Sequence, residues 1–266
     1  MIAMNGANIR ARKSLGQNFL KDSHYLYKIA DAARVGPQDL VLEIGPGLGH
    51  LTHVLAARAK KVLALELDER LISHLRQEFS MLRNIEIVQA DALEYPYESL
   101  LARWKVVANL PYYISTPIIQ RLIACRNKFM TLTLMLQQEV AERVASPPGS
   151  KAYGYLSVLV QLYAEPRIEF VVPPGAFTPM PEVNSAVITL TIRDHPAVVV
   201  DENYFIRLVK AAFSQRRKTL RNALKQLDAP LAKLEMAQGK TGIDLSRRAE
   251  TLTVKEFGLL ADFFAS

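Results

Sequence analysis

Residues 109–112, with the sequence Asn-Leu-Pro-Tyr, combine groups that could act on the exocyclic amine of a nucleobase. They follow the apolar run 105–108, which predicts a buried strand that ends near the proline, because proline cannot continue a sheet ladder. Open α/β sheets bind their ligands at the carboxyl ends of strands. We therefore expect residues 109–112 to lie in a ligand crevice.

Each of these residues has a part in the predicted chemistry. The side-chain carbonyl of Asn109 and the backbone carbonyl of Leu110 can each accept a hydrogen bond from a planar amino group. Two acceptors that bend the N–H bonds out of the ring plane localise the nitrogen lone pair towards a methyl donor. Pro111 stiffens the turn, and Tyr112 offers a ring on which a base can stack. Residues 109–112, called the tetrad below, favour methyl transfer to a base amine. An isolated motif of this kind, however, more often marks a β-turn with a core tyrosine.

A glycine-rich turn upstream could hold the methyl donor. The largely apolar stretch 40–44 predicts a buried strand. Glycines follow the strand at 45, 47 and 49, and a helix is predicted over 50–58. Gly45 and Gly47 allow the backbone to turn sharply and to approach a ligand without a Cβ in the way. We expect both glycines to bind a cofactor.

Two acids stand near the ends of the next predicted strands, 62–67 and 85–91. Glu66 lies about twenty residues beyond the first glycine, where an acid can accept both hydroxyls of a ribose. Asp91 closes its strand and is placed to meet the exocyclic amine of an adenine. A surface or helix-capping role is the alternative for each acid, but their shared position at strand ends favours ligand contact.

NAD(P) dehydrogenases and S-adenosylmethionine (SAM) methyltransferases both use such a turn with such an acid. The spacing here is Gly-x-Gly-x-Gly preceded by Glu43, rather than the Gly-x-Gly-x-x-Gly of dinucleotide binders. SAM has no pyrophosphate and needs an acid for its ribose and a polar group for its adenine, which Glu66 and Asp91 supply. We therefore predict SAM as the cofactor. An NAD-dependent oxidoreductase is the alternative, and it does not explain residues 109–112.

Strand and helix patterns alternate along most of the chain. Further strands are predicted over 130–137, 167–172 and 186–192, and helices over 22–34, 68–79, 115–124, 139–145 and 155–163. This order predicts an α/β protein with a Rossmann-like, doubly wound and mostly parallel sheet that ends in an antiparallel edge. Such a sheet is the fold of class I SAM-dependent methyltransferases.

The pattern becomes helical from residue 202 to the end. Seven basic residues and no acid lie between residues 203 and 227, namely Arg207, Lys210, Arg216, Arg217, Lys218, Arg221 and Lys225. We expect a methyltransferase domain over 1–194, with an amino-terminal arm at 1–21, and a small helical domain over 195–266 that contacts RNA phosphates. A basic face that only confers solubility is the alternative.

Composition limits the compartment and the partners. The net charge of +7 favours a polyanionic partner, although charge alone is weak evidence. The mean hydropathy of +0.06 and the absence of a long uncharged apolar run argue against a transmembrane helix, and no secretory signal is visible at the amino terminus. A single cysteine, Cys125, fits a reducing cytoplasm. We expect a cytoplasmic monomer with neither a metal site nor a membrane partner.

Six segments in order carry a resemblance that covers nearly the whole chain. They are 16–20 (Gly-Gln-Asn-Phe-Leu), 43–49 (Glu-Ile-Gly-Pro-Gly-Leu-Gly), 109–115 (Asn-Leu-Pro-Tyr-Tyr-Ile-Ser), 173–177 (Pro-Pro-Gly-Ala-Phe), 213–218 (Phe-Ser-Gln-Arg-Arg-Lys) and 248–250 (Arg-Ala-Glu). The chain resembles the KsgA/RsmA family, the small-subunit rRNA adenine-N6,N6-dimethyltransferases. One departure is the segment 181–185, where Glu182 and Asn184 replace the more usual Lys and Asp. It leaves open which residues contact RNA after position 177.

The resemblance assigns roles to individual residues. It implies SAM contacts at Asn18, Leu20, Gly45, Glu66, Asp91 and Asn109. It implies that the rings of Tyr112 and Phe177 enclose the target adenine, so that Asn109, Leu110, Tyr112 and Phe177 form the catalytic set. RNA contacts are expected at Arg216, Arg217, Lys218, Arg221 and Arg248. The implied reaction is dimethylation of two adjacent adenines in the 3′-terminal hairpin loop of small-subunit (16S) rRNA, in the 30S subunit or its precursor, as part of ribosome biogenesis.

Two other readings within RNA biology stay open. The related Erm resistance methylases modify large-subunit rRNA, but Tyr112, the basic segment 213–218 and the long carboxyl-terminal region favour the small-subunit family. A non-catalytic RNA-binding or transcription-factor role has arisen among relatives. The intact tetrad and the ribose acid Glu66 argue that catalysis is retained.

Overall fold

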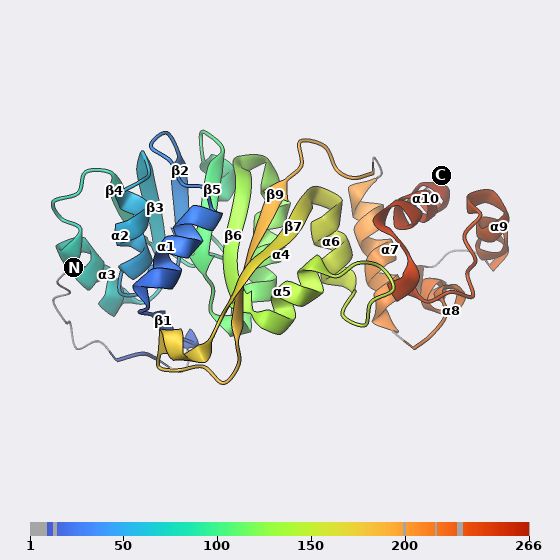
Figure 1. Ribbon diagram of the computed structural model, residues 1–266. Helices are drawn as coiled ribbons and strands as arrows, with labels where there is room; N and C mark the ends of the chain where they lie inside the picture. Colours follow the sequence, from blue (N-terminus) through green and yellow to red (C-terminus); the bar gives the residue numbers. More distant parts are fainter. Residues whose placement is uncertain (1–9, 13–14, 199–200, 216, 228–230, 266) are drawn as a thin grey trace. The chain divides into compact units, whose positions relative to one another are not determined.

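The computed structural model describes residues 10–12, 15–198, 201–215, 217–227 and 231–265 (Figure 1). The chain packs into two compact units, one of residues up to 141 together with 167–192, and one of residues 142–166 together with 193 onward. The second unit thus includes a segment that precedes the boundary expected at 194, because helix α6 (Tyr155–Tyr163) packs with the carboxyl-terminal helices. The division into a catalytic and an RNA-binding domain stays a prediction.

The first unit is built on a twisted sheet that, among the described residues, has seven strands in the order β4-β3-β2-β5-β6-β9-β7. The strands are β2 (Leu40–Ile44), β3 (Lys61–Glu66), β4 (Ile85–Gln89), β5 (Trp104–Asn109), β6 (Phe129–Gln137), β7 (Ala164–Val172) and β9 (Ser185–Ile192). Strands β2 to β6 pair in parallel, and β9 is antiparallel to β6. The predicted mostly parallel sheet with an antiparallel edge is confirmed.

Helices pack against this sheet, and its central strands are consequently buried on both faces (Figure 1). The helices are α1 (Ser23–Ala32), α2 (His50–Ala56), α3 (Glu69–Glu78), α4 (Ser115–Ala124) and α5 (Gln138–Ala145). Val106 and Val107 in β5 and Leu132 in β6 are completely buried. Burial on both faces explains why these strands read as continuous apolar runs in the sequence.

Most observed boundaries lie within two residues of the predicted ones, and two of the differences are informative. Strand β4 ends at Gln89, so Asp91 lies in the turn after the strand rather than in it. Strand β7 begins at Ala164, three residues earlier than predicted, and includes Pro166. Proline is tolerated there because β7 is the edge strand of the sheet, where one side of the ladder needs no partner.

The glycine-rich turn after β2 depends on two glycines. Gly49 precedes α2 with φ of +84°, and a Cβ there would lie 2.8 Å from Cε2 of Phe79. Gly47 has φ of +61°, and its Cβ would lie 3.0 Å from Cδ1 of Phe19. Both positions combine a left-handed backbone with a close neighbour, so glycine is required at each.

A short strand pairing that the sequence did not predict links the amino-terminal segment to a distant loop. Strand β1 (Phe19–Leu20) is antiparallel to β8 (Phe177–Thr178), with Leu20 opposite Phe177. The Lys21 N–H donates to the Ala176 carbonyl at 3.0 Å and extends this contact. Strands of two residues leave no periodic signal, and only the packing of the folded unit brings them together.

The second unit is helical among its described residues, apart from the first residues of β7. Besides α6 it contains α7 (Glu202–Ser214), α8 (Leu220–Leu224), α9 (Leu231–Thr241) and α10 (Val254–Ala265). Helix α10 packs on α7 and α9, and α7 packs on α8. Phe205, Leu208 and Phe257 are almost fully buried between these helices. The predicted carboxyl-terminal helical region is confirmed.

Candidate active site

A pocket opens at the carboxyl ends of the parallel strands, near the point where the strand order reverses between β2 and β5. Doubly wound sheets bind their ligands at this place. The empty space in the pocket is about 790 Å³, open solvent at its mouth included, which suits a small-molecule cofactor. The wall contains Asn18, Gly45, Gly47, Glu66, Asp91, Asn109, Leu110 and Tyr112. The structure therefore gathers most of the sequence-predicted site residues in one place.

Glu66, at the end of β3, is oriented by three backbone N–H groups. Its Oε1 accepts from the N–H groups of Leu67 and Asp68, both at 2.9 Å, and its Oε2 accepts from Gly47 at 3.2 Å. The residue is only 7% exposed, and this burial raises the pKa of its carboxyl group above the ordinary value, while the three hydrogen bonds act in the opposite direction. The glycine-rich turn thus holds the acid in place at the edge of the pocket.

Asn109, the last residue of β5, is fixed by a contact with the amino-terminal segment. Its Nδ2 donates to the backbone carbonyl of Asn18 at 3.1 Å. Because the amide nitrogen is used in this bond, the side-chain carbonyl on the other side of the amide is left as an acceptor. The next residue, Leu110, is 1% exposed, and its N–H donates to the Met135 carbonyl at 3.2 Å. The peptide that joins the two predicted acceptors is therefore rigid.

Tyr112 is half-buried at the start of a 3-10 turn (Tyr112–Ile114). Its hydroxyl shares a hydrogen bond of 2.7 Å with the hydroxyl of Ser185 in β9. Its backbone carbonyl accepts from the Ser115 hydroxyl at 3.0 Å. Burial raises the pKa of the phenol, so the ring stays neutral at physiological pH. These contacts place a neutral aromatic ring in the wall of the pocket.

Asp68 connects the amino-terminal segment to the turn that carries Glu66. Its carboxylate accepts from Gln17 Nε2 at 3.0 Å and from both Nε and Nη2 of Arg70, and it lies 3.6 Å from a guanidinium nitrogen of Arg12. The Arg70 guanidinium holds the pKa of Asp68 at about 2, so the group is ionised. Gln17 Oε1 in turn accepts from the Arg12 N–H at 2.8 Å. Residues 15–19, which form part of the pocket wall, are thereby tied to the end of β3.

Two of the predicted catalytic and cofactor-binding residues lie outside this pocket. Leu20 is 5% exposed and lines a smaller adjoining pocket, and its carbonyl lies 2.8 Å from His50 Nδ1. Phe177 is 4% exposed and packs in the hydrophobic core with Val172 and Ala176. Its role as a second stacking ring stays a prediction, because the ring would have to leave the core to reach a base.

The adjoining pocket contains a buried acid without a complete set of partners. Glu43, in β2, is 1% exposed, and its Oε2 has no hydrogen-bond partner among the described residues. Burial raises the pKa of Glu43 to about 8, and the nearby charge of Glu66 adds to the effect. Glu43 is therefore mostly protonated at neutral pH.

Sequence reasoning missed several apolar residues of the pocket wall. Leu67, Leu71 and Ile118 line it, and Tyr113 does so while 56% exposed. Leu67 carries a signal that could have been used, because it directly follows Glu66 at the end of a predicted strand, where such sheets bind their ligands. Asp68 was predicted only as the first residue of the helix 68–79.

The predicted RNA-binding residues lie in the second unit. Arg216 falls outside the described residues, whereas Arg217, Lys218, Arg221 and Arg248 are all exposed. Two backbone hydrogen bonds join the segments that carry them, because the Leu220 N–H donates to the Arg247 carbonyl at 2.8 Å and the Arg221 N–H to the Leu245 carbonyl at 3.0 Å. Basic residues that are about thirty positions apart in the sequence are thus brought onto adjoining segments.

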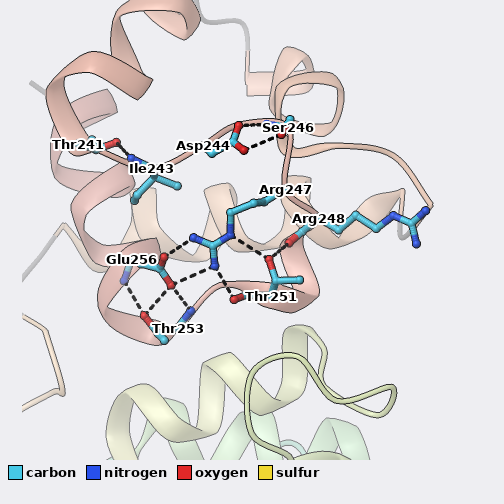
Figure 2. A network of polar contacts seen from close by, with 9 residues as sticks. All are labelled: Thr241, Ile243, Asp244, Ser246, Arg247, Arg248, Thr251, Thr253 and Glu256. Atoms are coloured by element: carbon cyan, nitrogen blue, oxygen red, sulfur yellow. Dashed lines mark hydrogen bonds and ion pairs between the residues drawn. The ribbon is translucent and has the colours of Figure 1, made fainter.

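The two arginines at 247 and 248 have different surroundings (Figure 2). Arg247 pairs with Glu256 and donates to the Thr251 carbonyl at 2.6 Å, and Glu256 accepts from the Thr253 N–H at 2.8 Å to cap α10. The Arg248 side chain extends away from this network (Figure 2). Arg247 therefore has a structural role, and Arg248 is available to a partner.

The sequence of this chain matches one protein family over almost its entire length. The family described as ribosomal RNA adenine dimethylase matches residues 8–266. The chain belongs to this family.

Similar proteins agree with this membership. The chain is 49% identical to the ribosomal RNA small subunit methyltransferase A of Geobacter metallireducens, over 97% of each chain, and 48% identical to that of Moorella thermoacetica, over 94% and 91%. Among solved structures, it resembles a dimethyladenosine transferase from Plasmodium falciparum (28% identity, TM-score 0.80, 91% and 95% of the two chains). It also resembles the 23S rRNA methyltransferase ErmE (27% identity, TM-score 0.73, 94% and 100%).

These relationships establish the fold and the cofactor of this rRNA adenine dimethylase. The class I methyltransferase fold is confirmed, as is the prediction of a SAM-dependent enzyme, and the NAD-dependent alternative is set aside. The pocket fits SAM, because it combines an oriented carboxylate with a glycine turn that leaves the backbone accessible. Among the described residues, no helix is long and apolar enough to cross a membrane. Nor do those residues contain a cluster of three or more His, Cys, Asp or Glu side chains suited to a metal ion.

Proposed function

We propose that this dimethylase transfers methyl groups to N6 of two adjacent adenines in the 3′-terminal hairpin loop of small-subunit rRNA. The observation that carries the proposal is identity close to one half, over nearly the full length, to relatives named small subunit methyltransferase A. Identity to the large-subunit enzyme ErmE is 27%, which makes the Erm-type substrate the second candidate. We further propose that the enzyme acts as a cytoplasmic monomer on the 30S subunit or its precursor during ribosome biogenesis.

In this proposal the cofactor lies against the residues that line the two adjoining pockets. Glu66 accepts the ribose hydroxyls, Asp91 accepts from the adenine amine, and Asn18, Leu20, Gly45 and Gly47 contact the remainder. Bound SAM supplies a methyl group on a sulfonium, so that transfer forms an N–C bond, breaks an S–C bond and leaves a neutral thioether. Glu66 can act as a double acceptor because backbone N–H groups already fix its orientation.

The base amine is held by the rigid peptide of Asn109 and Leu110. The Asn109 side-chain carbonyl accepts one N–H, and the Leu110 backbone carbonyl accepts the other. Tyr112 stacks on the base after the base leaves its own stack, as enzymes that act on bases require. Phe177 covers the opposite face once the loop that carries it has moved. Catalysis then consists mainly of positioning, and solvent takes the proton that leaves the amine.

The exposed basic residues of the second unit bind RNA phosphates in this proposal. Arg217, Lys218, Arg221 and Arg248 are exposed on adjoining segments, and phosphate contacts of this kind position a nucleic acid without reading its sequence. Arg216 is included as a prediction from the sequence alone.

The proposal is tested with 30S particles from cells that lack the modification. The particles are incubated with the protein and radiolabelled SAM, with purified large-subunit rRNA in parallel, and labelled adenines are mapped by primer extension. We expect label at two adjacent adenines of the 3′-terminal hairpin. Label confined to large-subunit rRNA would instead assign the chain to the Erm-type reaction. Absence of label in both, with SAM bound, would favour a non-catalytic role in RNA binding.

A further inference from the structure

The hydroxyl of Ser185 has no access to the pocket, yet it contacts the ring that lines it. Ser185 is the first residue of β9 and is completely buried. Its Oγ lies 2.7 Å from the Tyr112 hydroxyl. Residue 185 pairs with Gln137 at the carboxyl end of β6, and the Asn184 carbonyl accepts from the Gln138 N–H at 3.0 Å. Ser185 is thus a fixed point of the sheet from which the tyrosine is held.

This contact restricts one motion of the tyrosine. Rotation about the Cα–Cβ bond moves the hydroxyl away from Ser185 and breaks the hydrogen bond, whereas rotation of the ring about its own axis leaves the hydroxyl in place. The Ser115 hydroxyl, also buried, anchors the Tyr112 carbonyl at 3.0 Å. The side chain is therefore fixed at its tip by Ser185, and its backbone is fixed by Ser115. Burial keeps the phenol neutral, so it can serve as a donor or an acceptor in the contact.

We propose that Ser185 is a positioning residue that holds the Tyr112 ring in place, through the ring hydroxyl, for the second methyl transfer to each adenine. The inference rests on the proposed stacking of the base on Tyr112. An unmodified amine has two N–H bonds, and both acceptors of the 109–110 peptide can orient it. N6-methyladenine retains one N–H, so one acceptor loses its partner. The stacking ring must then contribute more to orienting the base.

The same two strands offer a matched control. Thr133 in β6 and Thr189 in β9 are paired in register, and their hydroxyls lie 3.3 Å apart. Both residues are buried, as Ser185 is. Thr189 lies four residues further along β9, about 13 Å from Ser185 for an extended strand. Thr189→Val therefore removes a comparable buried contact from the same strand without touching the pocket wall.

The test measures methylation of unmodified 30S particles by the wild-type protein, Ser185→Ala, Tyr112→Phe, the double variant and Thr189→Val. Mass spectrometry of the nucleosides gives the ratio of monomethyladenosine to dimethyladenosine, and calorimetry gives the affinity for SAM. We expect Ser185→Ala and Tyr112→Phe each to lower kcat/KM roughly threefold to tenfold, the range of one hydrogen bond, and to raise the share of monomethyladenosine. SAM affinity should stay within about twofold of wild type, as should both methylation readouts for Thr189→Val.

The double variant decides whether Ser185 acts through the tyrosine hydroxyl. If it does, the double variant is no worse than either single variant, because both substitutions remove the same bond. The inference would be overturned if the loss of kcat/KM in the double variant equalled the product of the two single losses. A wild-type ratio of monomethyladenosine to dimethyladenosine in Ser185→Ala would also overturn it. Tyr112→Ala separates this inference from the function it depends on. Wild-type activity in Tyr112→Ala would reject the stacking role itself, whereas loss of activity there with a normal Ser185→Ala variant would reject only the role of Ser185.

Discussion

Among single residues, Glu66 offers the clearest test that separates cofactor binding from catalysis. Its oxygens already accept three backbone hydrogen bonds, so the carboxylate is oriented before a ligand arrives. We expect Glu66→Ala to weaken SAM binding by roughly tenfold to hundredfold, because hydrogen bonds to a charged acceptor are lost. Isothermal calorimetry with SAM measures this effect. An unchanged affinity would contradict the assignment of Glu66 to the ribose.

Glu43 gives a prediction about stability and pH. Its pKa is about 8 in the folded protein and near 4.5 in the unfolded chain, so between these values the folded state holds a proton that the unfolded state has lost. Stability contributed by this group therefore falls as the pH rises from 4.5 to about 8, by at most about 1.4 kcal/mol per pH unit.

Glu43→Gln removes this proton linkage while retaining the shape of the side chain. We expect the melting temperature of the variant, relative to wild type, to increase steadily between pH 5 and pH 8. Thermal unfolding at several pH values provides the measurement. Parallel curves for the two proteins would refute the burial of a neutral acid at this position.

At the scale of elements, the amino-terminal segment depends on Asp68. The carboxylate holds Gln17, Arg12 and Arg70 while it also caps α3, accepting from the Arg70 N–H at 3.2 Å. Asp68→Asn keeps a capping side chain but removes the charge. We expect faster dissociation of SAM and of the demethylated product, about threefold to tenfold, because residues 15–19 lose one of their attachments to the pocket.

Stopped-flow fluorescence measures these dissociation rates, and cleavage by trypsin after Arg12 reports on the segment itself. Asp22→Asn is the matched control, because Asp22 caps α1 by accepting from the His24 N–H at 2.9 Å. The attachment would be rejected if Asp68→Asn and Asp22→Asn had equal dissociation rates and equal rates of cleavage.

The elements also explain what the sequence could and could not predict. The strands that carry Glu66 and Asn109 were predictable, because burial on both faces leaves long apolar runs that end at polar residues. The pairing of Leu20 with Phe177 was not, because it joins two-residue strands that are 157 positions apart in the chain. The burial of Phe177 follows from that pairing. The Ser185 contact likewise depends on the register of β9 against β6, which no local pattern encodes.

At the scale of the whole molecule, the second unit supplies a comparison of two neighbouring arginines. Arg248→Ala and Arg247→Ala remove the same charge, but only Arg247 supports the cap of α10 (Figure 2). We expect Arg248→Ala to weaken rRNA binding and to reduce the salt dependence of the affinity by about 0.7 to 0.9 in logarithmic slope, the value for one phosphate. Its melting temperature should not change.

Arg247→Ala should instead lower the melting temperature by about 2–6 °C, because Glu256 and the Thr251 carbonyl lose their partner. Filter binding at several salt concentrations and thermal unfolding separate the two effects. A normal salt slope in Arg248→Ala would exclude a phosphate contact at this residue. The basic character of this region was visible in the sequence, but the distinction between these two arginines required the fold.

The most direct measurement of the central account compares wild type and Asn109→Ala on unmodified 30S particles. Quantitative mass spectrometry gives N6,N6-dimethyladenosine per particle, and calorimetry gives the SAM affinity of each protein. If Asn109 supplies an acceptor for the base amine, the variant loses at least about a hundredfold in turnover and less than about tenfold in SAM affinity. Near-normal dimethylation by Asn109→Ala would contradict the account of how residues 109–112 transfer the methyl group.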